Sequence, residues 1–151
     1  MPTPTSPTSP TLSYAFEIRA EIATPLHIGH GTGEHTEFTP ITGGTVRGPR
    51  LTGTVLSGGG DWSSTRGEVC QLEARYLLRA DDGAVIDIVN RGYYHESHPD
   101  PAGSGAPDVY FRTAPVFRTD APAHLWLTRT VFVGLAHDDG DAIVIRCYSL
   151  G

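Results

Sequence analysis

Lysine is absent from this 151-residue chain, in which all eleven basic residues are arginine. Without a side-chain amine no Schiff base can form, so enzymes that work through a lysine imine are excluded. Cysteine is nearly absent as well, since the chain holds only Cys70 and Cys147. Two cysteines are typical of buried free thiols in a cytoplasmic protein rather than of a disulfide scaffold.

Long apolar runs and an excess of positive charge are also missing. No run approaches the roughly 20 apolar residues of a membrane span, and no basic segment precedes an apolar one near the N-terminus, so we expect neither a membrane anchor nor a secretory signal. The net charge is −6, with 17 acidic residues. Nucleic-acid binding needs a basic face, and we therefore expect no nucleic-acid partner.

Glycine and proline are abundant, with 18 and 12 copies. Both residues interrupt helices, and their density excludes a helical bundle or a coiled coil. Residues 1–11 hold four of the prolines among serine and threonine, which predicts a disordered tail. The remaining residues, 12–151, have the length of one domain.

Alternating apolar and polar residues predict strands through this domain. The pattern is clearest over residues 12–22. Residues 68–79 have a composition that also suits a helix, but we predict a strand because they alternate and Asp81-Asp82-Gly83 then predicts a hairpin turn into residues 84–89. Further turns are expected at Gly58–Asp61 and Asp138–Asp141, a Gly- and His-rich connection at 25–40 and a polar loop at 95–107. Other strands are expected within 41–56 (two short ones), 109–113, 116–118, 124–134 and 142–148. About eight to ten strands joined by tight turns predict an up-and-down barrel or a sandwich, and such a barrel can hold one small ligand.

Four segments carry a resemblance to a known family: residues 43–62, 74–84, 110–117 and 125–129. Together they resemble the domain-of-unknown-function family 3237 (DUF3237), which comprises small β-barrel proteins. The resemblance implies an all-β fold, a single antiparallel up-and-down β-barrel that is lipocalin-like and has a small-molecule lumen. Thr36, Glu37 and Thr128 depart from the family pattern, which has two arginines and an asparagine at these places. The departures suit a pocket adapted to a different substrate.

Asp61 and Trp62 directly follow three glycines that let the backbone bend sharply. A carboxylate shielded by an indole has a raised pKa and can act as a general acid or base. The alternative is that Asp61 caps the turn and Trp62 plugs the end of the barrel. We take Asp61 as a candidate catalytic residue and Trp62 as a candidate substrate contact.

Polar residues inside otherwise apolar strands are the second group of candidates. Arginine suits carboxylates, enolates and phenolates, and a tyrosine hydroxyl can hydrogen-bond a carbonyl oxygen, so Arg75, Tyr110 and Arg112 are further catalytic candidates. The alternative is that these side chains face solvent on the outer wall. The substrate-binding candidates, besides Trp62, are Tyr76, Trp126, Arg129 and His35.

His27, His30 and His35 lie within nine residues of one another, beside Glu34 and Glu37. Such a set can bind zinc, but the glycines among the histidines leave the ligand geometry unfixed, so we expect no metal. A proton shuttle or substrate contact at the rim of the pocket is a more modest role, and solvated loop histidines are the simplest interpretation.

The sequence therefore favours a cofactor-free enzyme that holds a small, largely apolar metabolite in the barrel. It would catalyse cyclisation, isomerisation or elimination by proton transfer in specialised (natural-product) metabolism. The alternative is a non-catalytic, lipocalin-like carrier or sensor of a hydrophobic small molecule. The expected partner is the small molecule, and exposed edge strands would allow a homodimer.

Overall fold

The computed structural model describes residues 3–98, 100, 102 and 105–151, and these residues form ten strands and one 3₁₀ helix. All strand pairs are antiparallel. The elements are β1 (Leu12–Ile22), β2 (Leu26–Gly29), β3 (His35–Arg47), β4 (Gly53–Val55), β5 (Gly59–Arg66), β6 (Val69–Ala80), β7 (Val85–Ser97), β8 (Asp108–Arg118), η1 (Pro122–Arg129), β9 (Phe132–Asp138) and β10 (Ala142–Leu150).

The strands close into a barrel because β1 pairs with both β10 and β3. Between them the wall runs β10-β9-β8-β7-β6, and β4 and β5 share the place between β6 and β3. The ring thus has eight places, and β2 continues the edge of β3 beyond the end of β1. This arrangement confirms the predicted single antiparallel barrel.

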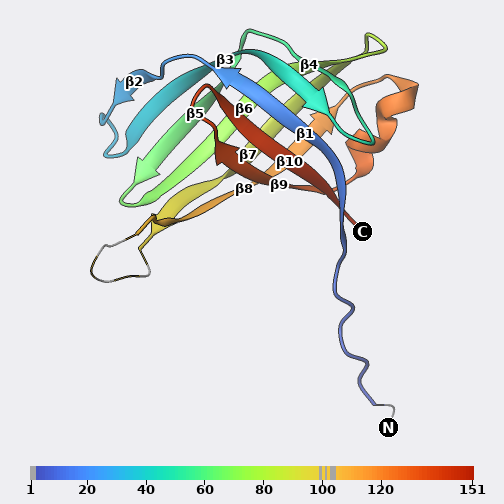
Figure 1. The fold of residues 1–151 in the computed structure, drawn as a ribbon, viewed down its shortest axis with the longest axis horizontal. Coiled ribbons are helices and arrows are strands. Elements are labelled where there is room, and N and C mark those ends of the chain that lie inside the picture. The colour runs from blue at the N-terminus through green and yellow to red at the C-terminus, as the bar shows by residue number, and fades with distance from the viewer. Residues whose placement is uncertain (1–2, 99, 101, 103–104) are drawn as a thin grey trace.

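One end of the barrel is filled by aromatic side chains. Phe16, Phe117 and Phe132 are at most 2% exposed, and their ring centroids lie 5.1–6.0 Å apart. The helix η1 covers this end, where Leu127 is 1% exposed and the Trp126 ring lies 5.7 Å from that of Phe132. In Figure 1, η1 and β2 lie at opposite ends of the barrel, so the β2 end is the one that remains for access.

Several local predictions need correction. Residues 124–134 are not one strand, because η1 starts at Pro122, a residue that suits the first turn of a helix, and β9 begins only at Phe132. The predicted connection at 25–40 contains β2 and the start of β3. The turn predicted at Gly58–Asp61 ends at Gly58, since β5 begins at Gly59.

Residues 109–118 form one strand rather than two, although Pro115 lies within it. Proline lacks the N–H that a central strand needs. Here β8 pairs with β9 only at Arg112 and Thr113, so position 115 has no ladder partner on that side. The strand therefore continues through the proline.

Residues 3–11 have no regular secondary structure and are exposed, and residues 1–2 of the predicted tail lie outside the described residues. The predicted polar loop at 95–107 begins later than expected, because β7 extends to Ser97; residues 99, 101, 103 and 104 of that loop also lie outside the described residues. Cys70 and Cys147 are free thiols, of which Cys147 is buried and Cys70 only half-buried. Among the described residues, no helix has the length and apolar character needed to cross a membrane.

Candidate functional site

A cavity of about 180 Å³ lies inside the barrel. Most of its wall is apolar and comes from inward-facing residues such as Ala20, Ile41, Leu72, Ala74, Phe111 and Ile145. Ile22, Pro25 and Asp138, at the strand ends toward β2, also line it. The cavity therefore lies toward the end of the barrel that η1 does not cover.

Of the six polar side chains in this wall, which include Thr39 and Asp138, four have a buried oxygen without a hydrogen-bond partner among the described residues. They come from four consecutive strands, β5 to β8: Asp61, Tyr76, Asn90 and Thr113. A buried polar group without a partner costs about 1–3 kcal/mol, and native proteins keep few of them. Their concentration in one cavity indicates a site for the polar atoms of a ligand.

The strand register places Asp61 and Asn90 in one row. Asp61 is paired with Ala74, and Ala74 is paired with Asn90. Since neighbouring strands lie about 4.8 Å apart, the backbones of Asp61 and Asn90 are separated by about 10 Å. The small side chain of Ala74 between them leaves room for a ligand.

Burial changes the acidity of Asp61. Loss of hydration raises the pKa of this carboxyl from 3.8 to about 6, and a hydrogen bond from the backbone of Glu73 acts in the opposite direction. A carboxyl with a pKa near 6 populates both of its forms close to neutral pH. Asp61 can therefore either donate or accept a proton.

Tyr76 and Asn90 supply hydrogen-bond donors in the same cavity. Tyr76 is 3% exposed, and burial, followed by the nearby Cys147 and Asp61, raises the pKa of its hydroxyl. The hydroxyl therefore stays protonated and can donate to a ligand oxygen. Asn90 is 2% exposed and adds an amide that can both donate and accept.

Thr113 occupies a space that two glycines leave open. Gly92 and Gly134 are its partners on β7 and β9. A Cβ atom at position 134 would lie 2.2 Å from the Thr113 Oγ1, and one at position 92 would lie 2.7 Å from its Cγ2. The two glycines thus make room for this side chain in the wall.

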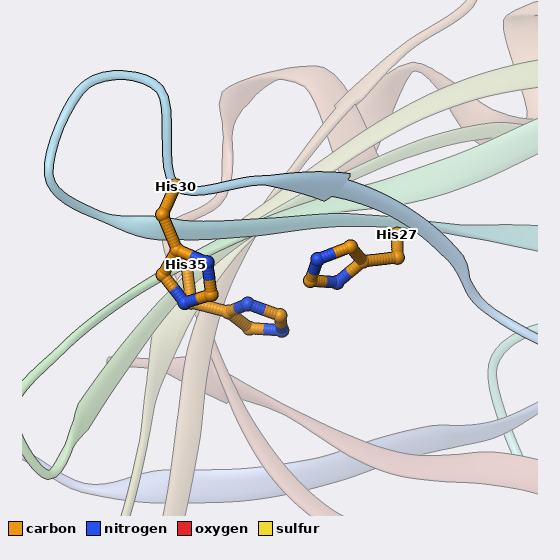
Figure 2. A group of neighbouring side chains, drawn as sticks. All are labelled: His27, His30 and His35. Atoms are coloured by element: carbon orange, nitrogen blue, oxygen red, sulfur yellow. The ribbon is translucent and has the colours of Figure 1, made fainter.

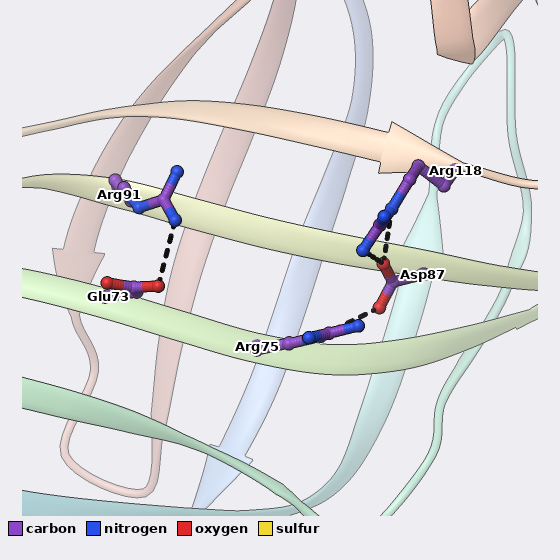
Figure 3. Close-up of polar contacts among 5 residues, drawn as sticks. All are labelled: Glu73, Arg75, Asp87, Arg91 and Arg118. Atoms are coloured by element: carbon purple, nitrogen blue, oxygen red, sulfur yellow. Dashed lines mark hydrogen bonds and ion pairs between the residues drawn. The ribbon is translucent and has the colours of Figure 1, made fainter.

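Arg75, Tyr110 and Arg112 do not line the cavity, which corrects the expectation that they act in the lumen. On β6, Arg75 forms ion-pair contact with Asp87 at 3.3 Å, and Asp87 also pairs with Arg118 at 3.0 Å. Figure 3 shows these contacts on the outer wall, together with the Arg91–Glu73 pair at 3.1 Å.

On β8 the strand alternation turns Phe111 and Thr113 inward, and hence Tyr110 and Arg112 outward. Tyr110 stacks on His95 with ring centroids 4.7 Å apart. Arg112 donates a hydrogen bond of 2.9 Å to the backbone oxygen of Phe111. Both side chains therefore have partners outside the cavity.

The other predicted contacts are spread over the molecule. Trp62 faces outward and packs on Phe38, with ring centroids 4.6 Å apart. Trp126 lies on η1 under the guanidinium of Arg50, 3.7 Å from the ring centroid, and Arg129 ends the same helix. His35 starts β3.

Of the nine residues predicted for the site, the structure thus brings only Asp61 and Tyr76 together at the cavity. Neither Asn90 nor Thr113 is among the residues predicted for the site from the sequence. Asn90 lies two residues after the inward-facing Ile88, and Thr113 lies two residues after the inward-facing Phe111. The alternation of each strand therefore places both side chains on its inner face and could have predicted them.

A closed antiparallel ring of strands around an apolar cavity defines a β-barrel protein. Residues 10–150 match the family described as "Protein of unknown function (DUF3237)", and the chain belongs to this family. The resemblance seen in the sequence is thereby confirmed.

Relatives match along almost the whole chain. A UPF0311 protein of Rhodopseudomonas palustris (strain TIE-1) is 36% identical over 152 residues, covering 94% of this chain and 99% of the relative. A crystal structure of a β-barrel like protein from Acinetobacter baumannii AYE has a TM-score of 0.90 at 30% identity, covering 97% of this chain and 99% of the other. The hydroalkoxylation enzyme phnH of Penicillium herquei is 32% identical over 82 residues, covering 53% of this chain and 54% of the fungal protein.

Proposed function

We propose that the protein is an enzyme that binds a small, largely apolar metabolite in the barrel cavity. The proposed chemistry is cyclisation, isomerisation or elimination by proton transfer, within natural-product metabolism. The observation that carries this proposal is a set of four polar side chains in one apolar cavity, each with a buried oxygen that has no hydrogen-bond partner among the described residues. One of them is a carboxyl whose pKa is raised to about 6.

In the proposed mechanism, Tyr76 and Asn90 hold an oxygen of the substrate, and the apolar wall holds its carbon skeleton. Asp61 then transfers the proton. Because burial keeps Tyr76 protonated, its hydroxyl serves as a donor and Asp61 remains the acid–base group.

The fungal relative supports hydroalkoxylation as the reaction to test first. In this reaction an O–H group adds across a C=C bond, so that a C–O and a C–H bond form while the O–H and the π bond break. A protonated Asp61 would give its proton to the alkene carbon and recover one from the substrate hydroxyl. The atoms balance without an oxidant or reductant, which is consistent with the expected cofactor-free enzyme.

The test uses the solvent as a label. A small-molecule extract of the producing cells is incubated in D₂O with wild-type protein, Asp61→Asn or the exposed carboxylate control Asp120→Asn. We expect wild type and Asp120→Asn to place deuterium on a carbon of one metabolite, detected by mass spectrometry and NMR. Asp61→Asn should not do so. Equal labelling by Asp61→Asn would contradict the assignment of this residue.

The mostly apolar wall of the cavity also supports a second candidate function, that of a carrier or sensor. A carrier would bind a metabolite from the same extract, visible in a native mass spectrum, and release it without a change of structure or deuterium content. Binding without labelling, unchanged in Asp61→Asn, would favour the carrier over the enzyme.

A further inference from the structure

His27, His30 and His35 come together at the β2 end of the barrel, as Figure 2 shows. One ring nitrogen of each histidine lies within 4.8 Å of those of the other two. The ring centroids are 4.6 Å apart for His27 and His35, and 4.8 Å apart for His30 and His35. The centroids of His27 and His30 are 5.8 Å apart, so the three imidazoles are mutual neighbours, each with a nitrogen available as a ligand.

The backbone around the cluster is ordered by strand pairing and by a turn, rather than being a loose glycine-rich loop. His27 on β2 pairs with Glu37 on β3, directly beside His35 on the same face of β3. His30 lies in the turn between these strands, where its backbone oxygen accepts a 2.9 Å hydrogen bond from the amide of Gly33. The Thr36 hydroxyl also donates to the backbone oxygen of Gly29 at 3.0 Å.

Glu37 orients one of the three rings. Its Oε1 lies 2.8 Å from the Nε2 of His35, so that Nε2 carries the proton and donates it to the carboxylate. The Nδ1 of His35 is then the nitrogen with a free lone pair. A carboxylate that holds the far nitrogen of a histidine in this way is the usual support of a metal ligand. It also adds negative charge beside a site for a cation.

We propose that His27, His30 and His35 bind one divalent transition-metal ion, with zinc as the first candidate, and that Glu37 positions His35. Imidazole is a common ligand of zinc at 2.0–2.1 Å, which in a tetrahedral site places ligand nitrogens about 3.3 Å apart. His27 and His30 are exposed and can rotate to close the remaining gap. Three ligands leave a fourth position for water or for an oxygen of a bound molecule.

The metal site is separate from the acid–base site. His35 and Glu37 share a face of β3 with Thr39, which lines the cavity. At about 3.4 Å per residue, His35 lies about 14 Å along the strand from Thr39. The ion would therefore sit at the rim of the barrel, beyond reach of Asp61, and the proposal stands whether or not Asp61 is catalytic.

The test is a calorimetric titration of untagged, chelator-treated protein with zinc chloride, repeated with cobalt chloride and followed by visible absorption. We expect one ion per chain and a cobalt spectrum typical of nitrogen ligation. His30→Ala and His35→Ala should each weaken zinc binding at least tenfold, and Glu37→Gln should weaken it about 10- to 100-fold. The exposed His137→Ala, outside the cluster, and Asp61→Asn should bind as the wild type does.

Hydrogen exchange provides a second, independent readout. Zinc should slow the exchange of backbone amides within residues 27–36, where the proposed ligands lie, and not in the β6–β7 hairpin. If His35→Ala does not fold, as judged by circular dichroism, His30→Ala in the exposed turn carries the same test. No zinc binding to wild type, or equal binding by wild type and His30→Ala, would overturn the proposal.

Discussion

At the scale of single residues, the burial that suits Asp61 to its proposed acid–base role also lowers the stability of the folded protein at neutral pH. Burial raises its pKa from 3.8 to about 6, so the folded state binds a proton more tightly than the unfolded chain does. The contribution of Asp61 to stability should therefore fall as pH rises from about 4 to about 6 and stay low above that range. Integrated over the shift, the cost reaches up to about 3 kcal/mol.

Asp61→Asn should remove this cost. We expect the variant to exceed wild type in free energy of unfolding at pH 8, with the difference disappearing near pH 4. Urea denaturation between pH 4 and pH 8 measures the difference in free energy of unfolding between the variant and wild type, and Asp120→Asn is the matched control on the surface. A difference that does not vary with pH would contradict the raised pKa.

Tyr76→Phe tests the second polar group of the cavity. The change removes a buried hydroxyl that has no partner, so the free energy of unfolding should stay within about 1 kcal/mol of wild type or rise. Deuterium incorporation into the metabolite should instead fall about 10- to 100-fold, because the substrate oxygen loses a donor. Thermal unfolding and the labelling assay separate the two effects, and loss of stability without loss of labelling would argue against the proposed role.

Asp61 shows what a sequence can reveal about a site. Its position after three glycines predicts a site residue, and Tyr76 is predicted because it is a polar side chain in an apolar strand. Arg75 and Arg112 are predicted for the same reason, yet strand alternation turns both outward. The direction of a strand's inner face depends on which neighbours it pairs with, and composition alone does not fix that.

At the scale of elements, the contact between β8 and β9 depends on glycine. A methyl group at position 134 would meet the Thr113 Oγ1 at 2.2 Å and the Ile145 Cγ2 at 2.9 Å. Gly134→Ala should therefore cost about 1–3 kcal/mol of the free energy of unfolding, because the packed wall must shift.

The expected control is Gly31→Ala, since nothing lies within 4 Å of a Cβ atom there. Adding Thr113→Ala to Gly134→Ala should recover part of the loss, as removal of Oγ1 relieves the closer of the two contacts. Both effects are measured by chemical denaturation. Equal stability of Gly134→Ala and Gly31→Ala would contradict the prediction, because it would show that the strands around position 134 can move apart at little cost.

The helix η1 should contribute stability without contributing to the cavity. Leu127, at 1% exposure, is its buried residue in the core, so Leu127→Ala should cost about 2–4 kcal/mol. The half-buried Leu125→Ala should cost less. Ligand capture in a native mass spectrum should be retained by Leu127→Ala at a temperature where the variant is folded, since η1 lies at the other end of the barrel from β2.

Sequence patterns predicted the long strands well and this helix wrongly. In residues 12–22 the period of two extends over eleven residues and predicts a strand, and in residues 68–79 it outweighs a composition that also suits a helix. Around Leu125 and Leu127 the alternation is too short to distinguish a strand from a short helix, and packing against the core decides between them. The sequence predicts a connection rather than a strand at β2, because four residues are too few to carry a periodic signal.

At the scale of the whole molecule, local patterns predict strands joined by tight turns but do not distinguish a barrel from a sandwich. Closure depends on β1 pairing with β10 and β3, contacts between segments far apart in the chain that no local pattern reports. The family resemblance supplied that step. A homodimer stays a prediction, and β2, at the end of the strand order, is the edge through which it would form. Light scattering would measure it.

The pairing of β1 with β10 affects the order in which the strands of the barrel can fold. The two strands pair from Leu12–Leu150 to Glu21–Ala142, and the backbones of Thr11 and Gly151 exchange hydrogen bonds in both directions. The hairpins from β6 to β8 can form as soon as they are synthesised, whereas β1 cannot pair with β10 until all the other strands have been made. Until then β1 can pair with β3 along one edge, and its other edge stays open. A circular permutant that joins residues 11 and 151 and begins in the turn at Gly140 would make β10 and β1 consecutive, and would turn the slowest contact into a local one.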